Sequence, residues 1–352
     1  MPTIHDVAKQ AGVAPITVSR VINNSGYVSK ETRERVETAI AELEYVPNVI
    51  ARSLRSKRTN TLALVLTDIT NPFFTVIARG VEDTASEAGM TVIYCNTDES
   101  EVEEEKYLQL VLQKQVDGIL LVPARSVPKS VHLIQEQGTS VVVLDRKIPG
   151  VEVDIVRGDS EGGAYQLVKL LLDLGHTHIA VLSGPADVST AEDRVIGYRR
   201  ALEEASLLDN EMVYFGAFTQ ASGFEMAQKA LSHSPRPTAI FAANNFIAYG
   251  ALKALNEAGL EVPGAIAMVA FDDLPPGLVT EPILTVAAQP AYEMGRKATE
   301  LLLNRLQAED PEQFQEIILP TELIVRSSSG TERNEGPPFG GQNLKSVAET
   351  LR

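Results

Sequence analysis

The sequence predicts an α/β protein with a small all-α helix-turn-helix head, followed by a body of two subdomains built on parallel sheets. Two short amphipathic segments flank Gly12 near the N-terminus. From residue 61 onward, short apolar runs alternate with amphipathic helical segments, a pattern typical of parallel sheets covered on both faces. The first strand–helix unit of this body, at Leu62–Asp68, has a counterpart at His178–Gly184, which predicts two similar subdomains hinged around a ligand.

The first predicted helix begins at Thr3, which forms the T-x-x-D pattern of a capping box with Asp6. Gly12 ends the helix, because glycine enters the left-handed region freely. Between them lies an apolar stripe with helical spacing, formed by Ile4, Val7, Ala8 and Ala11.

The second predicted helix opens with Pro15, a residue favoured at the first helical position. Its inward side is formed by Val18, Val21 and Ile22. Its outward side is formed by Ile16, Thr17, Ser19, Arg20 and Asn23. Short polar side chains with one arginine suit phosphates and base edges. A helical hairpin with a solvated face has the same pattern, so this stretch alone favours DNA binding only modestly.

A third predicted helix follows the cap at Ser29 and ends before Pro47. The head therefore spans residues 1–47, and a basic linker spans residues 48–60. This linker is too short to form a stable helix unaided. Residues 1–60 hold nine Lys/Arg and six Asp/Glu, or +3, whereas the rest of the chain holds 22 basic and 41 acidic residues, or −19, for a net charge of −16. A basic head on an acidic body confines the attraction for phosphates to the head.

The body is predicted to contain eight strands and seven helices. The strands are Thr61–Leu66, Met90–Cys95, Gly118–Val122, Ser140–Leu144, His178–Leu182, Met212–Phe215, Ala239–Ala242 and Ile266–Phe271. The helices are Phe73–Ala88, Val102–Lys114, Lys129–Gln137, Gly162–Leu174, Arg194–Ala205, Ser222–Leu231 and Phe246–Ala258.

Several classes of protein are not supported. The chain has no G-x-G-x-x-G after the first strand of either half, no Walker loop, no H-E-x-x-H and no G-x-S-x-G. His176 and His178 have no evident third ligand, so a turn role is favoured over a metal site. We expect no catalytic residues, no metal and no cofactor. Cys95 is the only cysteine, and with no apolar leader and no run of 18 apolar residues we expect a cytoplasmic protein without a membrane partner.

Polar residues follow several predicted strands, where open α/β sheets bind ligands. They are Asp68 to Asn71, Asp145-Arg146, Asn244-Asn245 and Asp272-Asp273. Arg194 is expected to open a helix, where its charge opposes the helix dipole and therefore indicates another role. Of Phe73 and Phe74, we expect one in the core and one facing a ligand ring. Carboxylate, amide and guanidinium groups form bidentate hydrogen bonds with vicinal hydroxyls or a heterocycle edge.

Five stretches carry a family resemblance: TIHDVAKQAGV, TVSRVIN, GYVSKETRERV, LEYVPNVIARSLRS and NTLALVLTDITNPFF. Together they closely resemble the LacI/GalR family of bacterial transcriptional regulators, and the resemblance extends to about Ser328. It implies a periplasmic-binding-protein-like body for effector binding and dimerisation at 61–328. Its N-subdomain would span about 61–159 and 290–320, and its C-subdomain about 160–288 and 321–328. Three crossing segments would lie near Asp159, near Gln289 and near Leu319–Glu322.

Matched residue by residue, the resemblance implies two sets of contacts. The DNA contacts would be Thr3, Pro15, Ile16, Thr17, Ser19, Arg20, Asn23, Tyr27, Asn48, Ala51, Leu54 and Arg55. The effector contacts would be Asn71, Phe73, Phe74, Asp145, Thr190, Arg194, Asn244, Asp272 and Gln289. Two departures matter. Ala14 stands where the family often has Ser, which costs the second helix about 1 kcal/mol of capping, and Asn244-Asn245 stands where Asn-Asp is usual.

The resulting hypothesis is a repressor of carbohydrate uptake and catabolism genes that is controlled by a sugar-type effector. A homodimer would read a near-palindromic operator, with Asn48–Ser56 folding on DNA and Leu54 wedging into the minor groove. A purine or nucleoside effector is the alternative, and a soluble sugar-binding module without a DNA role is the alternative from another class. Inducer and corepressor action both stay open. Residues 329–352 are expected to be a disordered tail, in which one heptad leaves a tetramer possible.

Overall fold

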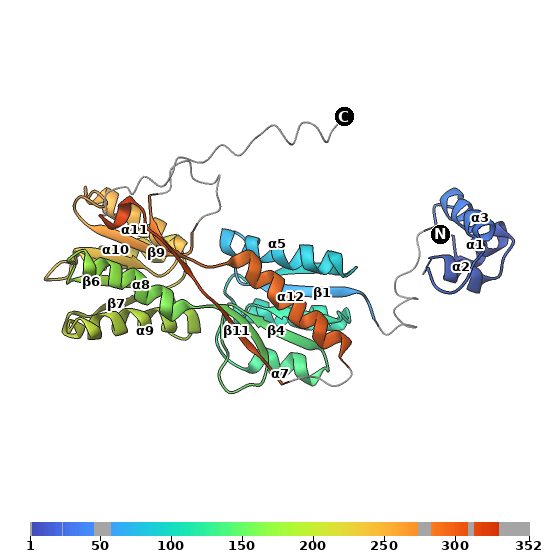
Figure 1. The fold of residues 1–352 in the computed structure, drawn as a ribbon, viewed down its shortest axis with the longest axis horizontal. Coiled ribbons are helices and arrows are strands. Elements are labelled where there is room, and N and C mark those ends of the chain that lie inside the picture. The colour runs from blue at the N-terminus through green and yellow to red at the C-terminus, as the bar shows by residue number, and fades with distance from the viewer. Residues whose placement is uncertain (1, 23, 46–57, 274–282, 309–312, 331–352) are drawn as a thin grey trace, which may run out of the picture. The chain divides into compact units, whose positions relative to one another are not determined.

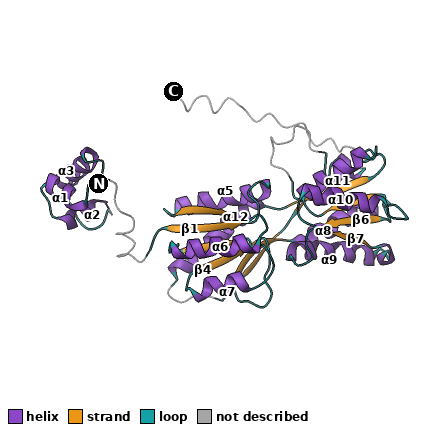
Figure 2. Cartoon of the chain, turned by 180° about the vertical axis from the view of Figure 1, so that it is seen from behind, coloured by secondary structure: helices purple, strands orange, loops and turns teal. Residues whose placement is uncertain are grey.

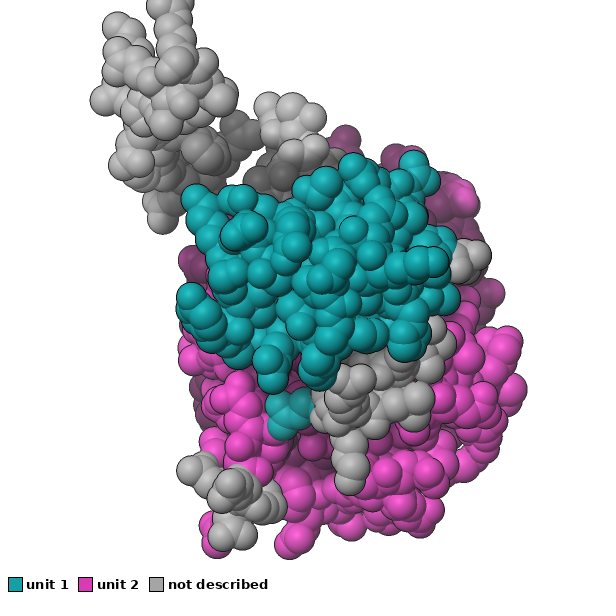
Figure 3. Space-filling view, turned by 90° about the vertical axis from the view of Figure 1, so that its right-hand side faces the viewer, with its two compact units in different colours: residues 1–59 teal, residues 60–352 magenta. Residues whose placement is uncertain are grey.

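The structure is a computed structural model that describes residues 2–22, 24–45, 58–273, 283–308 and 313–330. The chain divides into two compact units, residues 1–59 and 60–352, which Figure 3 colours separately. Most of the predicted linker and the predicted tail lie outside the described residues. Among the helices of the described ranges, none is both long enough and apolar enough to cross a membrane.

The first unit contains α1 (Ile4–Ala11), α2 (Pro15–Ile22) and α3 (Lys30–Glu42) (Figure 1). The predicted capping box is confirmed, because the Thr3 N–H donates to Asp6 Oδ2 at 2.7 Å and the Asp6 N–H donates to Thr3 Oγ1 at 3.4 Å. Gly12 ends α1 in the left-handed conformation with φ 65°. The core of this unit is formed by Val7, Ala8, Ala11, Val18, Val21, Val36 and Ala39.

The described residues of the second unit form two six-stranded sheets. The first sheet has the order β11-β5-β4-β3-β1-β2 and all its strands are parallel. Its strands are β1 (Thr61–Leu66), β2 (Thr91–Asn96), β3 (Gly118–Leu121), β4 (Ser140–Leu144), β5 (Asp154–Gly158) and β11 (Glu316–Leu319). Its helices are α5 (Pro72–Glu87), α6 (Glu101–Gln113), α7 (Lys129–Glu136) and α12 (Ala291–Gln307).

The second sheet has the order β12-β10-β9-β8-β6-β7, and β12 alone among these runs antiparallel, to β10. Its strands are β6 (Ile179–Ser183), β7 (Met212–Phe215), β8 (Ala239–Ala242), β9 (Ala267–Phe271), β10 (Thr285–Ala288) and β12 (Glu322–Ile324). Its helices are α8 (Ser160–Asp173), α9 (Ser189–Glu204), α10 (Gln220–Leu231) and α11 (Asn245–Glu257), with short 3₁₀ turns at Leu208–Asn210 and Ser327–Ser329.

Each sheet lies between two layers of helices, as Figure 2 shows. In β1, alternate residues point to opposite faces: Leu62, Leu64 and Leu66 pack under α5 and α12, whereas Ala63 and Val65 pack under α6 and α7. In the second sheet, α10 and α11 cover one face and α8 and α9 the other. The predicted α/β class with a helix-turn-helix head and two parallel-sheet subdomains is confirmed.

Within the described ranges, the chain passes between the two sheets three times. It leaves β5 for α8 at Asp159, leaves β10 for α12 at Gln289, and leaves β11 for β12 at Pro320 and Thr321. We call the body around the first sheet the first subdomain and that around the second sheet the second subdomain. The carboxyl ends of β1 to β4 and of β6 to β9 face the boundary between them (Figure 1).

Two features of the body differ from the sequence-based prediction. The sequence pattern does not predict β5, β10, β11, β12 or the 17-residue α12. Arg194 does not open a helix, because α9 begins five residues earlier at Ser189. The first turn of α9 is polar in sequence but buried, with Ser189, Thr190 and Asp193 each at most 5% exposed. The dipole argument for Arg194 is therefore wrong, although its side chain does line the cleft.

Candidate ligand cleft and nucleic-acid interface

A cavity of about 200 Å³ lies at the subdomain boundary. Its walls come from strand ends and helix starts in both subdomains. The lining residues are Asp68, Asn71, Phe73, Phe74, Asp98, Glu99, Asp145, Arg146, Thr190, Arg194, Phe218, Thr219, Asn244 and Asp272. This set includes eight of the nine predicted effector contacts.

Two aspartates occupy matching positions in the two subdomains. Asp145 follows β4 and Asp272 follows β9, and both are left-handed, with φ 66° and 68°. Each N–H continues the sheet, because it donates to Val156 O at 2.9 Å and to Ala287 O at 3.0 Å respectively. A left-handed non-glycine residue is strained by about 1–3 kcal/mol and persists where its surroundings fix it. This conformation turns both carboxylates into the cavity.

The charge of Arg194 interacts with both of these carboxylates. Its guanidinium stacks on the Phe271 ring at 3.8 Å from the centroid and donates to Ala243 O at 2.5 Å. The side chain is 3% exposed, and burial lowers its pKa, with Asp272 and Asp145 opposing that shift. Its Nε has no hydrogen-bond partner within the described residues. Arg194 therefore keeps a donor that a bound molecule can use.

The Asp145 carboxyl is also buried, and it also has an atom without a hydrogen-bond partner among the described residues. It is 5% exposed, and its Oδ1 accepts no hydrogen bond from the part of the chain that the structure describes. Burial raises its pKa to about 6, while Arg146 and Arg194 oppose the rise. A ligand hydroxyl that donates to Oδ1 would satisfy this acceptor.

Asp272 is held by Gln289, whose Nε2 donates to Asp272 Oδ1 at 2.8 Å. Burial raises the Asp272 pKa, with Arg194 and this hydrogen bond opposing the rise. Gln289 is predicted from the sequence to contact effector directly, but it does not line this cavity. It borders an adjoining cavity of about 420 Å³ around Phe73, Val76 and Tyr292. Gln289 therefore supports Asp272 from the adjoining cavity, and its direct contact with the effector stays a prediction.

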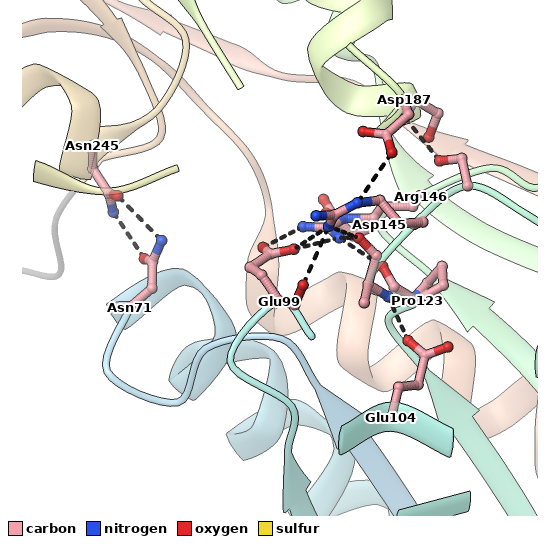
Figure 4. Close-up of polar contacts among 12 residues, drawn as sticks. Asn71, Glu99, Glu104, Pro123, Asp145, Arg146, Asp187 and Asn245 are labelled. Carbon is pink, nitrogen blue, oxygen red and sulfur yellow. Dashed lines mark hydrogen bonds and ion pairs between the residues drawn. The ribbon is translucent and has the colours of Figure 1, made fainter. Parts of the chain in front are cut away.

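The terminal nitrogens of Arg146 are already paired within the protein, whereas its Nε has no hydrogen-bond partner among the described residues. Its guanidinium donates to both Glu99 oxygens, at 2.8 and 2.5 Å, and to the carbonyls of Pro123 and Ala124 (Figure 4). Among the residues that the structure describes, the cavity wall carries five carboxyl groups and two guanidinium groups. An anionic ligand would therefore enter a wall with an excess of negative charge.

Three phenylalanine rings border the cavity. Phe73 and Phe74 meet edge to face, with centroids 5.1 Å apart, and both lie in the core of the first subdomain as well as in the cavity wall. The expected division into one core ring and one ligand-facing ring is wrong, since both residues do both. Phe218 comes from the second subdomain and lies over Gly184, where a Cβ would stand 2.1 Å from the ring.

The effector contacts implied by the resemblance lack six lining residues: Asp68, Asp98, Glu99, Arg146, Phe218 and Thr219. Of these, Asp68 and Arg146 are still among the polar residues predicted at strand ends. Asp98 and Glu99 follow β2, and Phe218 and Thr219 follow β7, each an edge strand of its sheet. A search for polar residues after every predicted strand would also find Asp98, Glu99 and Thr219, but it would not select the apolar Phe218.

The head presents a surface on α2 and the loop that follows it. Ile16 is 53% exposed, Tyr27 is 90% exposed, and Arg20 is exposed beside Gly26. Pro15, Thr17 and Ser19 are half-buried. Thr3 is exposed, but its hydroxyl also donates to Asp6 Oδ2 at 2.7 Å, so it caps α1. The remaining predicted DNA contacts lie outside the described residues: Asn23, Asn48, Ala51, Leu54 and Arg55.

Two family models match the chain. Residues 3–48 match "Bacterial regulatory proteins, lacI family", and residues 59–327 match "Periplasmic binding proteins and sugar binding domain of LacI family". The first match covers the three-helix head, and the second covers nearly all of the two-sheet body.

Three curated relatives align with almost the full chain. The HTH-type transcriptional regulator DegA of Bacillus subtilis is 39% identical, over 93% of this chain and 98% of its own. The ribose operon repressor of Halalkalibacterium halodurans is 38% identical, over 95% and 99%. The HTH-type transcriptional repressor PurR of Aliivibrio fischeri is 37% identical, over 93% and 98%.

Two solved structures are similar to this chain over almost its full length. The transcriptional regulator CelR–cellobiose complex is 35% identical, with a TM-score of 0.70 over 93% of this chain and all of its own. The lac repressor dimer bound to operator and an anti-inducer is 27% identical, with a TM-score of 0.82 over 93% and 99%. The matches to both family models, over head and body, establish that this chain belongs to the LacI family of bacterial DNA-binding transcriptional regulators.

Proposed function

We propose that this regulator is a repressor whose effector is a small neutral sugar. The observation that carries the proposal is a set of three buried polar atoms of cavity-lining residues that have no hydrogen-bond partner within the described residues: Asp145 Oδ1, Arg146 Nε and Arg194 Nε. The carboxylate oxygen needs a donor and each guanidinium nitrogen needs an acceptor, and a sugar hydroxyl provides both. The phenylalanine rings supply the apolar faces that sugar C–H groups contact.

The charge of the wall narrows the class of ligand. Arg146 is matched by Glu99, so Arg194 is the guanidinium left to meet the remaining carboxyl groups of the cavity. This balance supports a neutral polyol over a sugar acid or a phosphorylated sugar. The volume of about 200 Å³ is below the ~300–1,000 Å³ typical of sites for drug-sized ligands, which supports a single sugar ring.

A purine is the second candidate, and PurR is among the relatives. The rings of Phe73, Phe74 and Phe218 would also accept a planar base. The alternative of a soluble sugar-binding module without a DNA role has less support, because residues 3–48 match the family's DNA-binding head.

For the DNA side, we propose that a homodimer binds a near-palindromic operator upstream of carbohydrate genes. One short α2 contacts only a few base pairs, so two copies are needed for a specific site. Exposed Ile16 would contact a thymine methyl group, and Arg20 a phosphate or a base edge.

The effector proposal is tested by a thermal-shift screen followed by calorimetry on the full chain. The panel holds ribose, glucose, galactose, cellobiose, gluconate and hypoxanthine. We expect a neutral monosaccharide to raise the melting temperature, and Arg194→Ala to abolish the effect. Arg200→Ala is the matched control, since Arg200 lies exposed on the same helix in ion pairs with Glu161 and Glu204. Stabilisation by gluconate or hypoxanthine alone would contradict the neutral-sugar proposal.

A further inference from the structure

Two buried asparagines join the subdomains directly. Asn71 Nδ2 donates to Asn245 Oδ1 at 3.2 Å, and Asn245 Nδ2 donates to Asn71 Oδ1 at 2.9 Å (Figure 4). Asn71 caps α5 in the first subdomain, and Asn245 is the first residue of α11 in the second. They are 5% and 2% exposed. The pair is therefore a closed, reciprocal amide contact across the ligand cleft.

Asn71 borders the cavity, yet most of its hydrogen-bonding capacity is already used. Its Oδ1 accepts from the Phe73 N–H at 3.1 Å as well as from Asn245. Both lone pairs of that oxygen are thus engaged, and one amide hydrogen is engaged as well. Asn71 has less to offer a ligand than Asp145 or Arg194, whose atoms without a partner in the described chain lie at the same cavity.

Position 245 is also where this chain departs from the resemblance, which predicts an aspartate after Asn244. An aspartate carboxylate only accepts hydrogen bonds, whereas the asparagine amide accepts and donates. The amide allows the contact with Asn71 to be reciprocal and leaves it uncharged. Its strength should therefore be insensitive to salt.

We propose that the Asn71–Asn245 pair is a latch that holds the subdomains closed without ligand, and that Asn71 is a positioning residue that acts on ligand binding through closure. When a protein binds ligand in one conformation only, the apparent dissociation constant rises as the fraction in that conformation falls. Loss of the latch should thus weaken binding without removing a ligand contact.

Backbone hydrogen bonds elsewhere at the subdomain boundary can report whether the two subdomains are closed. Three backbone N–H groups donate across the same boundary: Ser126 to Asp187 O at 3.3 Å, Lys147 to Ser189 Oγ at 2.9 Å, and Ser189 to Ser126 Oγ at 2.8 Å. None of these residues touches the amide pair in the contacts described. Their hydrogen exchange should be slow only while the subdomains are closed.

The test is hydrogen–deuterium exchange of the ligand-free, full-length chain. Asn245→Ala removes both hydrogen bonds. Asn71→Ser also removes them but retains a side chain that caps α5. We expect each variant to speed exchange at the three reporter amides roughly ten- to thirtyfold, with unchanged exchange at Ile240 inside β8. The double variant should exchange no faster than either single variant, because the two residues act as one contact.

The matched control is Arg125→Ala, which breaks another contact across the boundary, an ion pair of 3.1 Å with the exposed Asp187. Its effect should be smaller and should fade with added salt, whereas the effect of Asn245→Ala should not. Unchanged reporter exchange in both Asn245→Ala and Asn71→Ser, with Ile240 still protected, would overturn the latch. Because no effector is present, this result is separable from a failure of the sugar proposal.

Discussion

Replacing Asp145 with asparagine removes a buried charge from the cleft, and we expect the ligand-free protein to become more stable. Burial raises the pKa of Asp145 from 3.8 to about 6. This difference of about 2.2 units corresponds to about 3 kcal/mol at about 1.4 kcal/mol per unit. The proposed ligand would offset this cost, since Asp145 Oδ2 lies 3.8 Å from Arg146 Nε but Oδ1 has no donor among the described residues.

The sign of the effect follows from linkage. The stabilisation by the raised pKa is full below about pH 4, where Asp145 is protonated in both states, and is lost as the pH rises through about 6. At neutral pH the folded state must hold a buried charge that the unfolded chain exposes to water. The asparagine side chain cannot ionise, so Asp145→Asn should gain about 3 kcal/mol near pH 7.5 but only about 1 kcal/mol near pH 4.5.

Urea unfolding of the full chain measures this difference, followed by circular dichroism because the chain has no Trp. The control is Glu225→Gln, which removes an equal charge from the exposed face of α10 and should change stability little at either pH. Equal stability of Asp145→Asn and the wild type near pH 7.5, or a gain that does not depend on pH, would refute the reasoning. The same variant should bind the effector poorly.

Three further predictions concern single side chains. Phe218→Ala removes an aromatic face from the cleft and should weaken effector binding roughly 10- to 100-fold in calorimetry; unchanged affinity would remove Phe218 from the site. Ala14→Ser adds a side-chain cap before α2 and should raise the unfolding free energy of the head by about 1 kcal/mol, measured by scanning calorimetry; an unchanged head transition would contradict it. Leu54→Ala should reduce the bending of a bound operator, measured by energy transfer between its ends, and unchanged bending would rule out the wedge.

Strands that are buried on both faces are readily predicted from the sequence. β1 at Thr61–Leu66 and β8 at Ala239–Ala242 fall where the sequence pattern places them, because a strand buried on both faces is a continuous apolar run. β5 escapes this rule, since Arg157 interrupts its apolar residues. That arginine pairs with Glu316 at 2.5 Å on β11, a partner 159 residues away. A pattern read over a few neighbouring residues cannot reveal an ion-pair partner that lies so far away in the sequence.

Helix α12 escapes prediction for a similar reason. Gly295 weakens its helical pattern, but the glycine is needed where α12 crosses α5. A Cβ on Gly295 would lie 2.2 Å from Ile77 O, and one on Gly80 would lie 2.2 Å from Tyr292 O. Close packing of two helices therefore overrides intrinsic propensity here. Sequence alone shows the cost of the glycine but not the neighbour that requires it.

In the cleft, the strand-end rule identifies Asp145 and Asp272 because parallel strands deliver their carboxyl ends to one edge. It does not reveal that Glu99 neutralises Arg146, nor that Asn71 engages Asn245. The Glu99–Arg146 pair joins residues that follow β2 and β4 of the same sheet, whereas the Asn71–Asn245 pair depends on the crossings that fold one subdomain against the other. The sequence therefore predicts which polar residues lie at the strand ends, but it does not predict which side chains they pair with.

Operator binding with and without effector is the decisive measurement for an allosteric repressor controlled by a neutral sugar. A duplex selected from a pool of palindromic sites is titrated with the full chain, and its anisotropy is measured over a range of salt concentrations. We expect two protomers per duplex, affinity that falls steeply with salt, and a shift in affinity on adding the neutral sugar that stabilises the protein. This shift should be absent in Arg194→Ala. Operator affinity that no sugar alters would contradict control of this repressor by a sugar.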